Sequence, residues 1–131
     1  PGLFLPCSAR NLNQSSAMNL HYLEIVTPDV ETTCALYSRV HDITFSEPCP
    51  ELGHARTAAL VGGGMIGVRA PMHDAEAPVG RPYLPVDDLA AAVTAAEGLG
   101  AKIALPAMEI PGRGKIALYF LDGVQHGLWQ V

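Results

Sequence analysis

The chain has 131 residues, a formal net charge of −5 and apolar side chains at 49% of its positions. Only 16% of the residues are charged, and this balance excludes a disordered chain. The eight lysines and arginines are scattered, so neither nucleic acid nor an acidic membrane is an expected partner. No apolar stretch approaches the roughly 20 residues of a membrane helix. Three cysteines are too few for a disulfide framework, and a cytoplasmic location is expected.

The beginning of the chain differs from the rest. Residues 1–17 lack periodicity, and a strand pattern opens at Met18. We therefore predict that 1–17 are an N-terminal extension or a cloning remnant, and that a single domain spans 18–131.

The first half of this domain reads as a strand, a helix and further strands. Strand formers run from Leu20 to Val26, and Asp29 is a candidate N-cap for the helix that follows. We expect another strand near residues 43–47. The glycine triplet within residues 60–68 predicts a β-hairpin.

The second half repeats this order. A short strand is predicted over 83–86, and Asp87 or Asp88 caps a helix that the glycines at 98 and 100 end. A further strand is expected over 102–108. The pair Asp122-Gly123 is a strong signal for a two-residue hairpin turn.

Equivalent features of the two halves lie about sixty residues apart, which indicates an internal duplication. We assign module one to about 18–70, a linker to 71–80 and module two to about 81–131. Each module is expected to be βαβββ. The predicted fold class is α+β, with two tandem modules forming an eight-stranded mixed sheet curved around a groove and helices on the convex side.

Local motifs agree with a known superfamily. They are His21-Tyr22-Leu23-Glu24-Ile25 followed by Pro28-Asp29 and Leu36-Tyr37, the segment 82–88, and the terminal Gly127-Leu128-Trp129-Gln130. On these motifs, residues 18–131 resemble the vicinal oxygen chelate superfamily, which includes glyoxalase I, extradiol dioxygenases, and bleomycin and fosfomycin resistance proteins. The chain looks closest to a glyoxalase-like branch of uncertain function. The resemblance also implies a homodimer.

Enzymes of this superfamily hold a divalent metal with four side chains, and the resemblance places those positions here. His21 occupies the first position, Gly67 the second and Gly127 the fourth, while Arg81 or Pro82 occupies the third. Glycine has no donor atom, and a cationic arginine repels a metal. Because only His21 is retained, we expect no metal site and no cofactor. A relocated Zn, Ni, Mn or Fe site is the alternative.

His21 and Glu109 are the candidate catalytic residues. Strand alternation, taken with the resemblance, is expected to put His21, Leu23 and Ile25 on the groove face. His21 could then act on a ligand, or it could simply bond a neighbouring carbonyl. Glu109 is a candidate general base, and a relocated metal site could use His21 with Glu109 or His126.

Ligand-binding candidates follow from the same strand parity. Trp129 and Met65 would form apolar walls of the groove, and Arg69 or Arg81 could fix a carboxylate or enolate oxygen. The opposing interpretation is that Trp129 is plain core and the arginines are solvated. The full candidate set is His21, Met65, Arg69, Arg81, Tyr83 and Trp129.

The sequence therefore predicts a small-molecule-binding protein of the glyoxalase and bleomycin-resistance type, without the usual metal. Its expected ligand is a small organic molecule, aromatic or anionic. The first alternative is a metal-dependent lyase, isomerase or dioxygenase of the same superfamily. The second is a non-catalytic dimeric interaction module. The ligand itself depends on a few contacts that the sequence does not identify.

Overall fold

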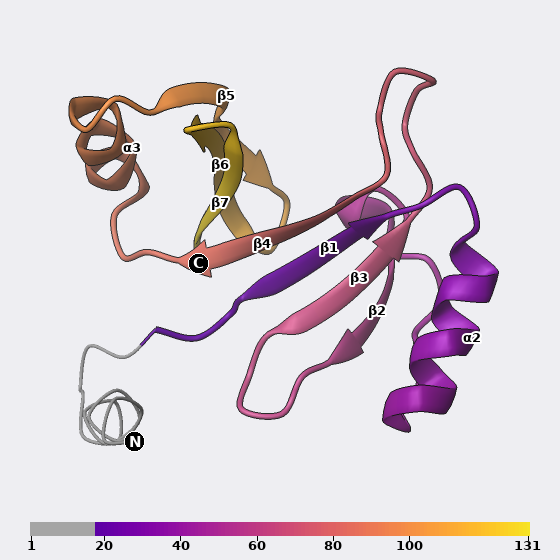
Figure 1. Ribbon diagram of the computed structural model, residues 1–131. Coiled ribbons are helices and arrows are strands. Elements are labelled where there is room, and N and C mark those ends of the chain that lie inside the picture. The colour runs from indigo at the N-terminus through magenta and orange to yellow at the C-terminus, as the bar shows by residue number, and fades with distance from the viewer. Residues whose placement is uncertain (1–17) are drawn as a thin grey trace, which may run out of the picture.

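The computed structural model describes residues 18–131, and the prediction for residues 1–17 lies outside them. Seven strands form one mixed sheet in the order β2-β3-β1-β4-β7-β6-β5, with two α-helices packed on it (Figure 1). The elements are β1 (Tyr22–Val26), α2 (Val30–His41), the 3-10 helix η1 (Pro50–Leu52), β2 (Arg56–Ala59), β3 (Met65–Arg69), β4 (Val79–Pro85), α3 (Leu89–Gly98), β5 (Lys102–Ile110), β6 (Gly114–Leu121) and β7 (Val124–Gln130).

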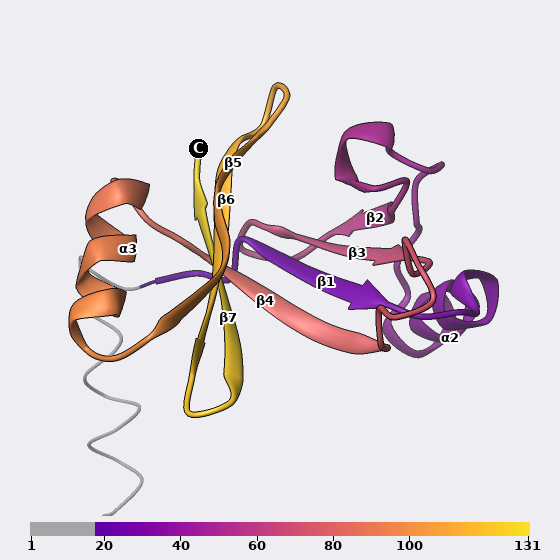
Figure 2. The same cartoon turned by 90° about the horizontal axis from the view of Figure 1, so that it is seen from above.

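The sheet is centred on two strands from different halves of the chain. Strands β1 and β4 pair antiparallel, β1 pairs parallel with β3, and β4 pairs parallel with β7. Figure 2 shows β5, β6 and β7 running steeply across the direction of β1, β2 and β3, so the sheet bends sharply where β4 meets β7. This bend produces the concave face on which the cavity lies.

The strand predicted near residues 43–47 is wrong: this described segment forms no strand, and the sheet has seven strands instead of eight. Helix α2 ends at Asp42 in a left-handed conformation, and a single backbone bond, from Ser46 N to Thr57 O (2.7 Å), ties the segment to β2. Phe45 is buried beneath α2 instead. Pro48 then ends the extended segment, because proline cannot donate to a strand ladder. The first half is therefore βαββ instead of the predicted βαβββ, whereas the second half has the predicted βαβββ order. The internal duplication stays a prediction.

Both helices begin where the sequence predicts. Asp29 Oδ1 accepts a hydrogen bond from the Thr32 amide (3.1 Å), and Asp88 Oδ1 accepts one from the Ala91 amide (3.0 Å). Asp88, not Asp87, is therefore the N-cap of α3. None of the helices within residues 18–131 is long and apolar enough to cross a membrane.

The hairpin predicted at Asp122-Gly123 joins β6 to β7. Asp122 has φ +53° and Gly123 has φ +79°, which are the two positive φ angles that a type I′ turn needs. The register of the β6–β7 pair follows from this turn, and it brings Trp129 opposite Ile116.

The two helices and the cavity lie on opposite faces of the sheet. Cys34 of α2 packs in a cluster with Ile66 and Val68 of β3. Leu89 of α3 packs with Ala117 of β6 and Leu128 of β7. A third cluster covers the concave face and contains the aromatic side chains Tyr22, Tyr83 and Trp129. The sheet is thus covered by helices on one side and carries a partly filled hollow on the other.

Candidate functional site

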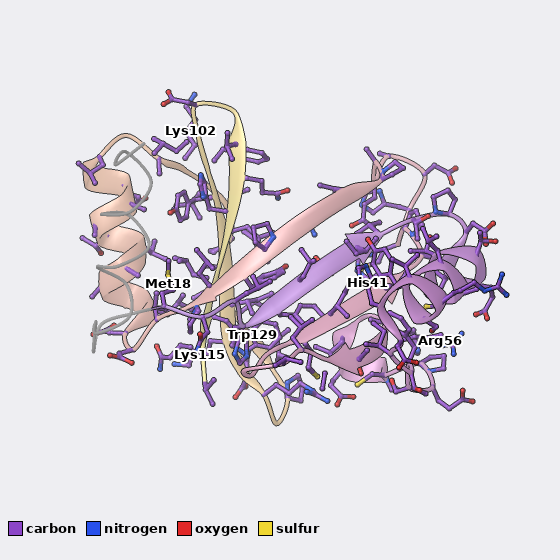
Figure 3. All side chains as sticks on the ribbon, turned by 60° about the horizontal axis from the view of Figure 1, so that its bottom comes forward. Met18, His41, Arg56, Lys102, Lys115 and Trp129 are labelled. Carbon is purple, nitrogen blue, oxygen red and sulfur yellow. The ribbon has the colours of Figure 1, made fainter. Side chains whose placement is uncertain are left out.

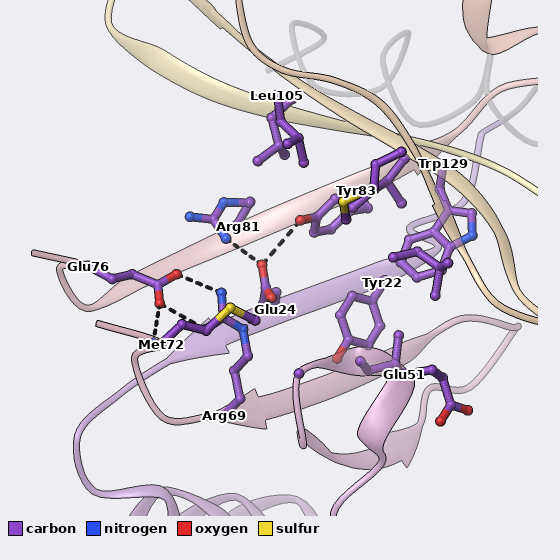
Figure 4. Close-up of a pocket in the computed structure, with 16 residues that line it drawn as sticks. Tyr22, Glu24, Glu51, Arg69, Met72, Glu76, Arg81, Tyr83, Leu105 and Trp129 are labelled. Carbon is purple, nitrogen blue, oxygen red and sulfur yellow. Dashed lines mark hydrogen bonds and ion pairs between the residues drawn. The ribbon is translucent and has the colours of Figure 1, made fainter. Parts of the chain in front are cut away.

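A cavity of about 380 Å³ opens on the concave face, between the β1–β4 part of the sheet and strands β5 and β6 (Figure 4). One wall is apolar and comes from Leu105, Met108, Ile110, Ile116 and Leu118. The facing wall is polar and comes from Tyr22, Glu24, Arg69, Glu76, Arg81 and Tyr83. Trp129 lies where the two parts of the sheet meet (Figure 3). Its ring centroid lies 5.5 Å from that of Tyr22 and 5.5 Å from that of Tyr83 (Figure 4).

Strand β1 supplies the polar wall through its alternation. Tyr22 and Glu24 are buried on the concave face, whereas Leu23 and Ile25 pack with the cluster under α2. The parity predicted for this strand is therefore wrong. Both faces of β1 are covered, so alternation alone could not distinguish the groove face from the helix face.

The Glu24 carboxylate is the centre of the polar wall. Its Oε2 accepts a hydrogen bond from Arg69 Nε (2.7 Å), and its Oε1 accepts one from Arg81 Nη1. The Tyr83 hydroxyl also donates to Oε1 at 3.2 Å. Because the side chains of Glu24 and Arg69 are only 10% and 5% exposed, this is a buried ion pair whose charges depend on each other.

Glu76 completes the network from the loop before β4. Its carboxylate accepts two bonds from Arg69, at 2.9 Å from Nη1 and 2.6 Å from Nη2, and a third from the Met72 amide (2.7 Å). These bonds to Arg69 lower the pKa of Glu76 from an ordinary value near 4.5 to about 2. Burial alone would lower the pKa of Arg69, but its bonds to Glu76 and Glu24 raise it instead.

Two tyrosines cover Gly67 and Gly127, the glycines at the second and fourth metal-ligand positions that the resemblance implies. A Cβ atom on Gly67 would lie 1.7 Å from the Tyr22 hydroxyl, and one on Gly127 would lie 2.6 Å from Cδ2 of Tyr83. The tyrosine rings therefore fill that space. Burial raises the pKa of both phenols, so both are protonated donors near neutral pH. The Tyr22 hydroxyl is buried without a hydrogen-bond partner among the described residues.

The donor set does not fit a divalent metal. Both oxygens of Glu24 are engaged by Arg69 and Arg81, and two guanidinium groups repel a cation. Within residues 18–131, no group of three or more His, Cys, Asp or Glu side chains comes together in a way that could hold a metal ion.

Four of the predicted ligand-binding residues, Arg69, Arg81, Tyr83 and Trp129, line this cavity together. His21 and Met65 do not line it; they border a separate depression on the other side of Trp129, and the His21 ring lies 4.8 Å from that of Trp129. Burial lowers the pKa of His21, which favours its neutral form.

The candidate bases of the second half lie elsewhere. Glu109 is exposed on β5 and pairs in register with Lys115, and it does not line the cavity. His126 stacks on Tyr119, with the ring centroids 4.9 Å apart. Neither Glu109 nor His126 lines the cavity or the separate depression that His21 borders.

Sequence reasoning missed Tyr22, Glu24 and Glu76. A signal for Glu24 was present: it is the one charged residue in an otherwise apolar or aromatic strand, and a buried carboxylate needs a cationic partner. Arg69, at the end of β3, is likewise the one charged residue in its strand. Nothing local identifies Glu76, which comes from a loop.

A hydrogen bond between the two halves of the chain lies at the rim of the cavity. Arg113 Nε, from the turn between β5 and β6, donates to Glu51 of η1 (3.1 Å), and the Trp129 indole donates to the Arg113 carbonyl (2.7 Å). Arg113 is therefore held at the rim by an acidic partner, Glu51, which lines the cavity.

Solved structures share this fold, although no family model and no curated protein matches the chain. The methylmalonyl-CoA epimerase of Mycobacterium tuberculosis superposes with a TM-score of 0.68 at 18% identity, covering 93% of this chain and 94% of the other. A hypothetical protein from Bacillus halodurans gives 0.67 at 13% identity, with coverages of 88% and 96%. A Streptomyces coelicolor epimerase in complex with 2-nitronate-propionyl-CoA gives 0.62 at 17%, with coverages of 88% and 98%. The resemblance to the vicinal oxygen chelate superfamily is thus confirmed for the fold.

Proposed function

We propose that this protein uses the vicinal oxygen chelate fold to bind a small, mainly apolar organic molecule in the cavity of the concave face, without a bound metal. The observation that carries the proposal is the division of the cavity into an apolar wall from β5 and β6 and a polar wall from β1, β3 and β4. Ligand sites are typically concave and mostly apolar, with a few fixed polar groups that orient the ligand.

Binding is favoured over catalysis because the carboxylates are occupied. A general base must reach the proton that it removes, but Glu24 and Glu76 already accept hydrogen bonds on both oxygens. To act as a base, Glu24 would have to remove a proton with oxygens that two arginines already engage in a buried site. A metal-dependent lyase, isomerase or dioxygenase would in addition need ligands that this cavity does not bring together.

The single tryptophan provides a direct test, because Trp129 lines the cavity. We expect saturable changes in its fluorescence, and a raised melting temperature, when small substituted benzamides and benzoates are screened. Leu105→Arg, which puts a charge on the apolar wall, should abolish the binding. Leu99→Arg is the matched control, because Leu99 is 81% exposed and lies outside the cavity. A screen in which no compound changes either signal would contradict the proposal.

We further propose that the protein forms a homodimer, as its superfamily resemblance implies. Light scattering on the purified chain should give twice the mass of 13.8 kDa. A monomer would contradict this proposal, and it would also remove the alternative in which the protein is only a dimeric interaction module.

A further inference from the structure

The charges on the polar wall of the cavity cancel. Glu24 and Glu76 contribute two negative charges, Arg69 and Arg81 contribute two positive ones, and every member is paired within the network. The side chains are between 5% and 16% exposed, so water screens them weakly. A charged ligand placed against this wall would add a charge that nothing in it balances.

Arg69 cannot receive an anionic ligand as the sequence suggested. Its Nε donates to Glu24, its Nη1 donates to Glu76 and to the Ala70 carbonyl, and its Nη2 donates to Glu76. A carboxylate could form a bidentate pair with Arg69 only by displacing Glu24 or Glu76, because four of its five N–H donors are already used and the remaining one, on Nη2, stands alone. The carboxylate site suggested at Arg69 is therefore occupied by the protein's own acidic side chains.

Arg81 differs because some of its donors are unused. Only its Nη1 donates within the described chain, to Glu24, and its Nε is buried without a partner. Its Nη2 also has no acceptor within residues 18–131, and unlike Nε it is not buried, so it is the donor that an oxygen of a ligand in the cavity can reach. Arg81 already has its charge balanced by Glu24, so an uncharged oxygen suffices.

Building on the proposed function, we infer that the cavity selects an uncharged ligand: an apolar body with an amide, ketone or ester oxygen that accepts from Arg81. The apolar body packs against Leu105, Ile116 and Leu118, opposite the network. The corresponding carboxylate is rejected, because its charge would be desolvated close to Glu24 without a free cation. The selectivity belongs to the network as a whole and not to one residue.

The test compares two molecules of nearly equal shape, 4-tert-butylbenzamide and 4-tert-butylbenzoate, by calorimetric titration at about pH 7.5, where the acid is ionised. We expect the wild-type protein to bind the amide at least about tenfold more tightly, a difference of about 1.4 kcal/mol. Glu24→Gln leaves the wall with one excess positive charge, so the preference should shift toward the benzoate by about tenfold or more. Glu76→Gln creates the same excess at the rim and serves if Glu24→Gln fails to fold.

Glu31→Gln is the matched control, since Glu31 pairs with Arg56 outside the cavity and its side chain is 79% exposed. It should leave the preference unchanged. Equal or tighter binding of the benzoate to the wild-type protein would overturn the inference while leaving the binding function intact. If neither molecule binds, and the screen by fluorescence and melting temperature also finds no ligand, both the proposed function and this inference are contradicted.

Discussion

Glu24 illustrates how one residue sets the chemistry of a site. It lies in β1, between β3 and β4, and its two oxygens join Arg69 of β3 to Arg81 and Tyr83 of β4. Three neighbouring strands are thereby cross-linked on the concave face. A buried pair is weak evidence of net stabilisation, but the loss of one partner leaves an uncompensated charge.

We therefore predict that Arg69→Met destabilises the protein by about 3 kcal/mol or more, because Glu24 and Glu76 both lose a cationic partner in a site where water is scarce. The free energy of unfolding in urea measures this. Arg56→Met is the control: its partner Glu31 is largely exposed, and we expect a change of no more than about 1 kcal/mol. Equal effects for the two variants would contradict the assigned role of the network.

The Glu76 pair predicts a dependence of stability on pH. Its pKa falls from about 4.5 to about 2 in the folded protein, so its contribution is present above the unfolded value and is lost as the pH falls from about 5 toward 2. Wild-type protein should be more stable than Glu76→Gln by on the order of 2 kcal/mol at neutral pH, and the difference should shrink over that range. Urea unfolding of both proteins at several pH values tests this; parallel curves would contradict it.

At the scale of elements, the two helix caps show which sequence signals are local. An N-cap needs only an acceptor side chain and the amides three residues ahead, so Asp29 and the Asp87-Asp88 pair could be identified before any tertiary contact was known. The prediction of an eighth strand was wrong because a strand forms only beside a partner strand with free backbone groups. Ile43, Thr44 and Phe45 favour a strand by residue type, but Ile43 and Phe45 pack in the cluster under α2 instead.

The capping bond itself can be tested on α3. Asp88→Ala should lower the free energy of unfolding by about 1 kcal/mol, because the Ala91 amide loses its acceptor. Asp87→Ala, one residue earlier, is the matched control and should change stability little. Urea unfolding followed by circular dichroism compares the two. A larger loss for Asp87→Ala would mean that α3 begins one residue earlier than the structure shows.

At the scale of the whole molecule, the sheet curves around a hollow, tyrosine rings cover Gly67 and Gly127, and a balanced ion network lines one wall. We therefore predict that protein incubated with Zn, Ni, Mn or Fe and then desalted carries far less than one metal ion per chain. Mass spectrometry of metal content checks this. Near-stoichiometric metal, lost in Glu24→Gln or His21→Ala, would show that a rebuilt metal site exists and would favour the enzyme alternative.

The sequence alone determined the α+β class and the positions of the helices and hairpins, because caps, turn residues and hydrophobic periodicity act over a few residues. The resemblance in fold rested on local motifs such as residues 21–25 and 127–130. The sequence also identified Arg69, Arg81, Tyr83 and Trp129 as candidates, and these four line one cavity. Only the tertiary structure decided which face of β1 lines the cavity, and that Arg69 is paired with both Glu24 and Glu76. The face of β1 depends on strand register, and the pairing of Arg69 depends on Glu76 from the loop before β4. The energies of buried charges depend on partners that no local sequence pattern specifies.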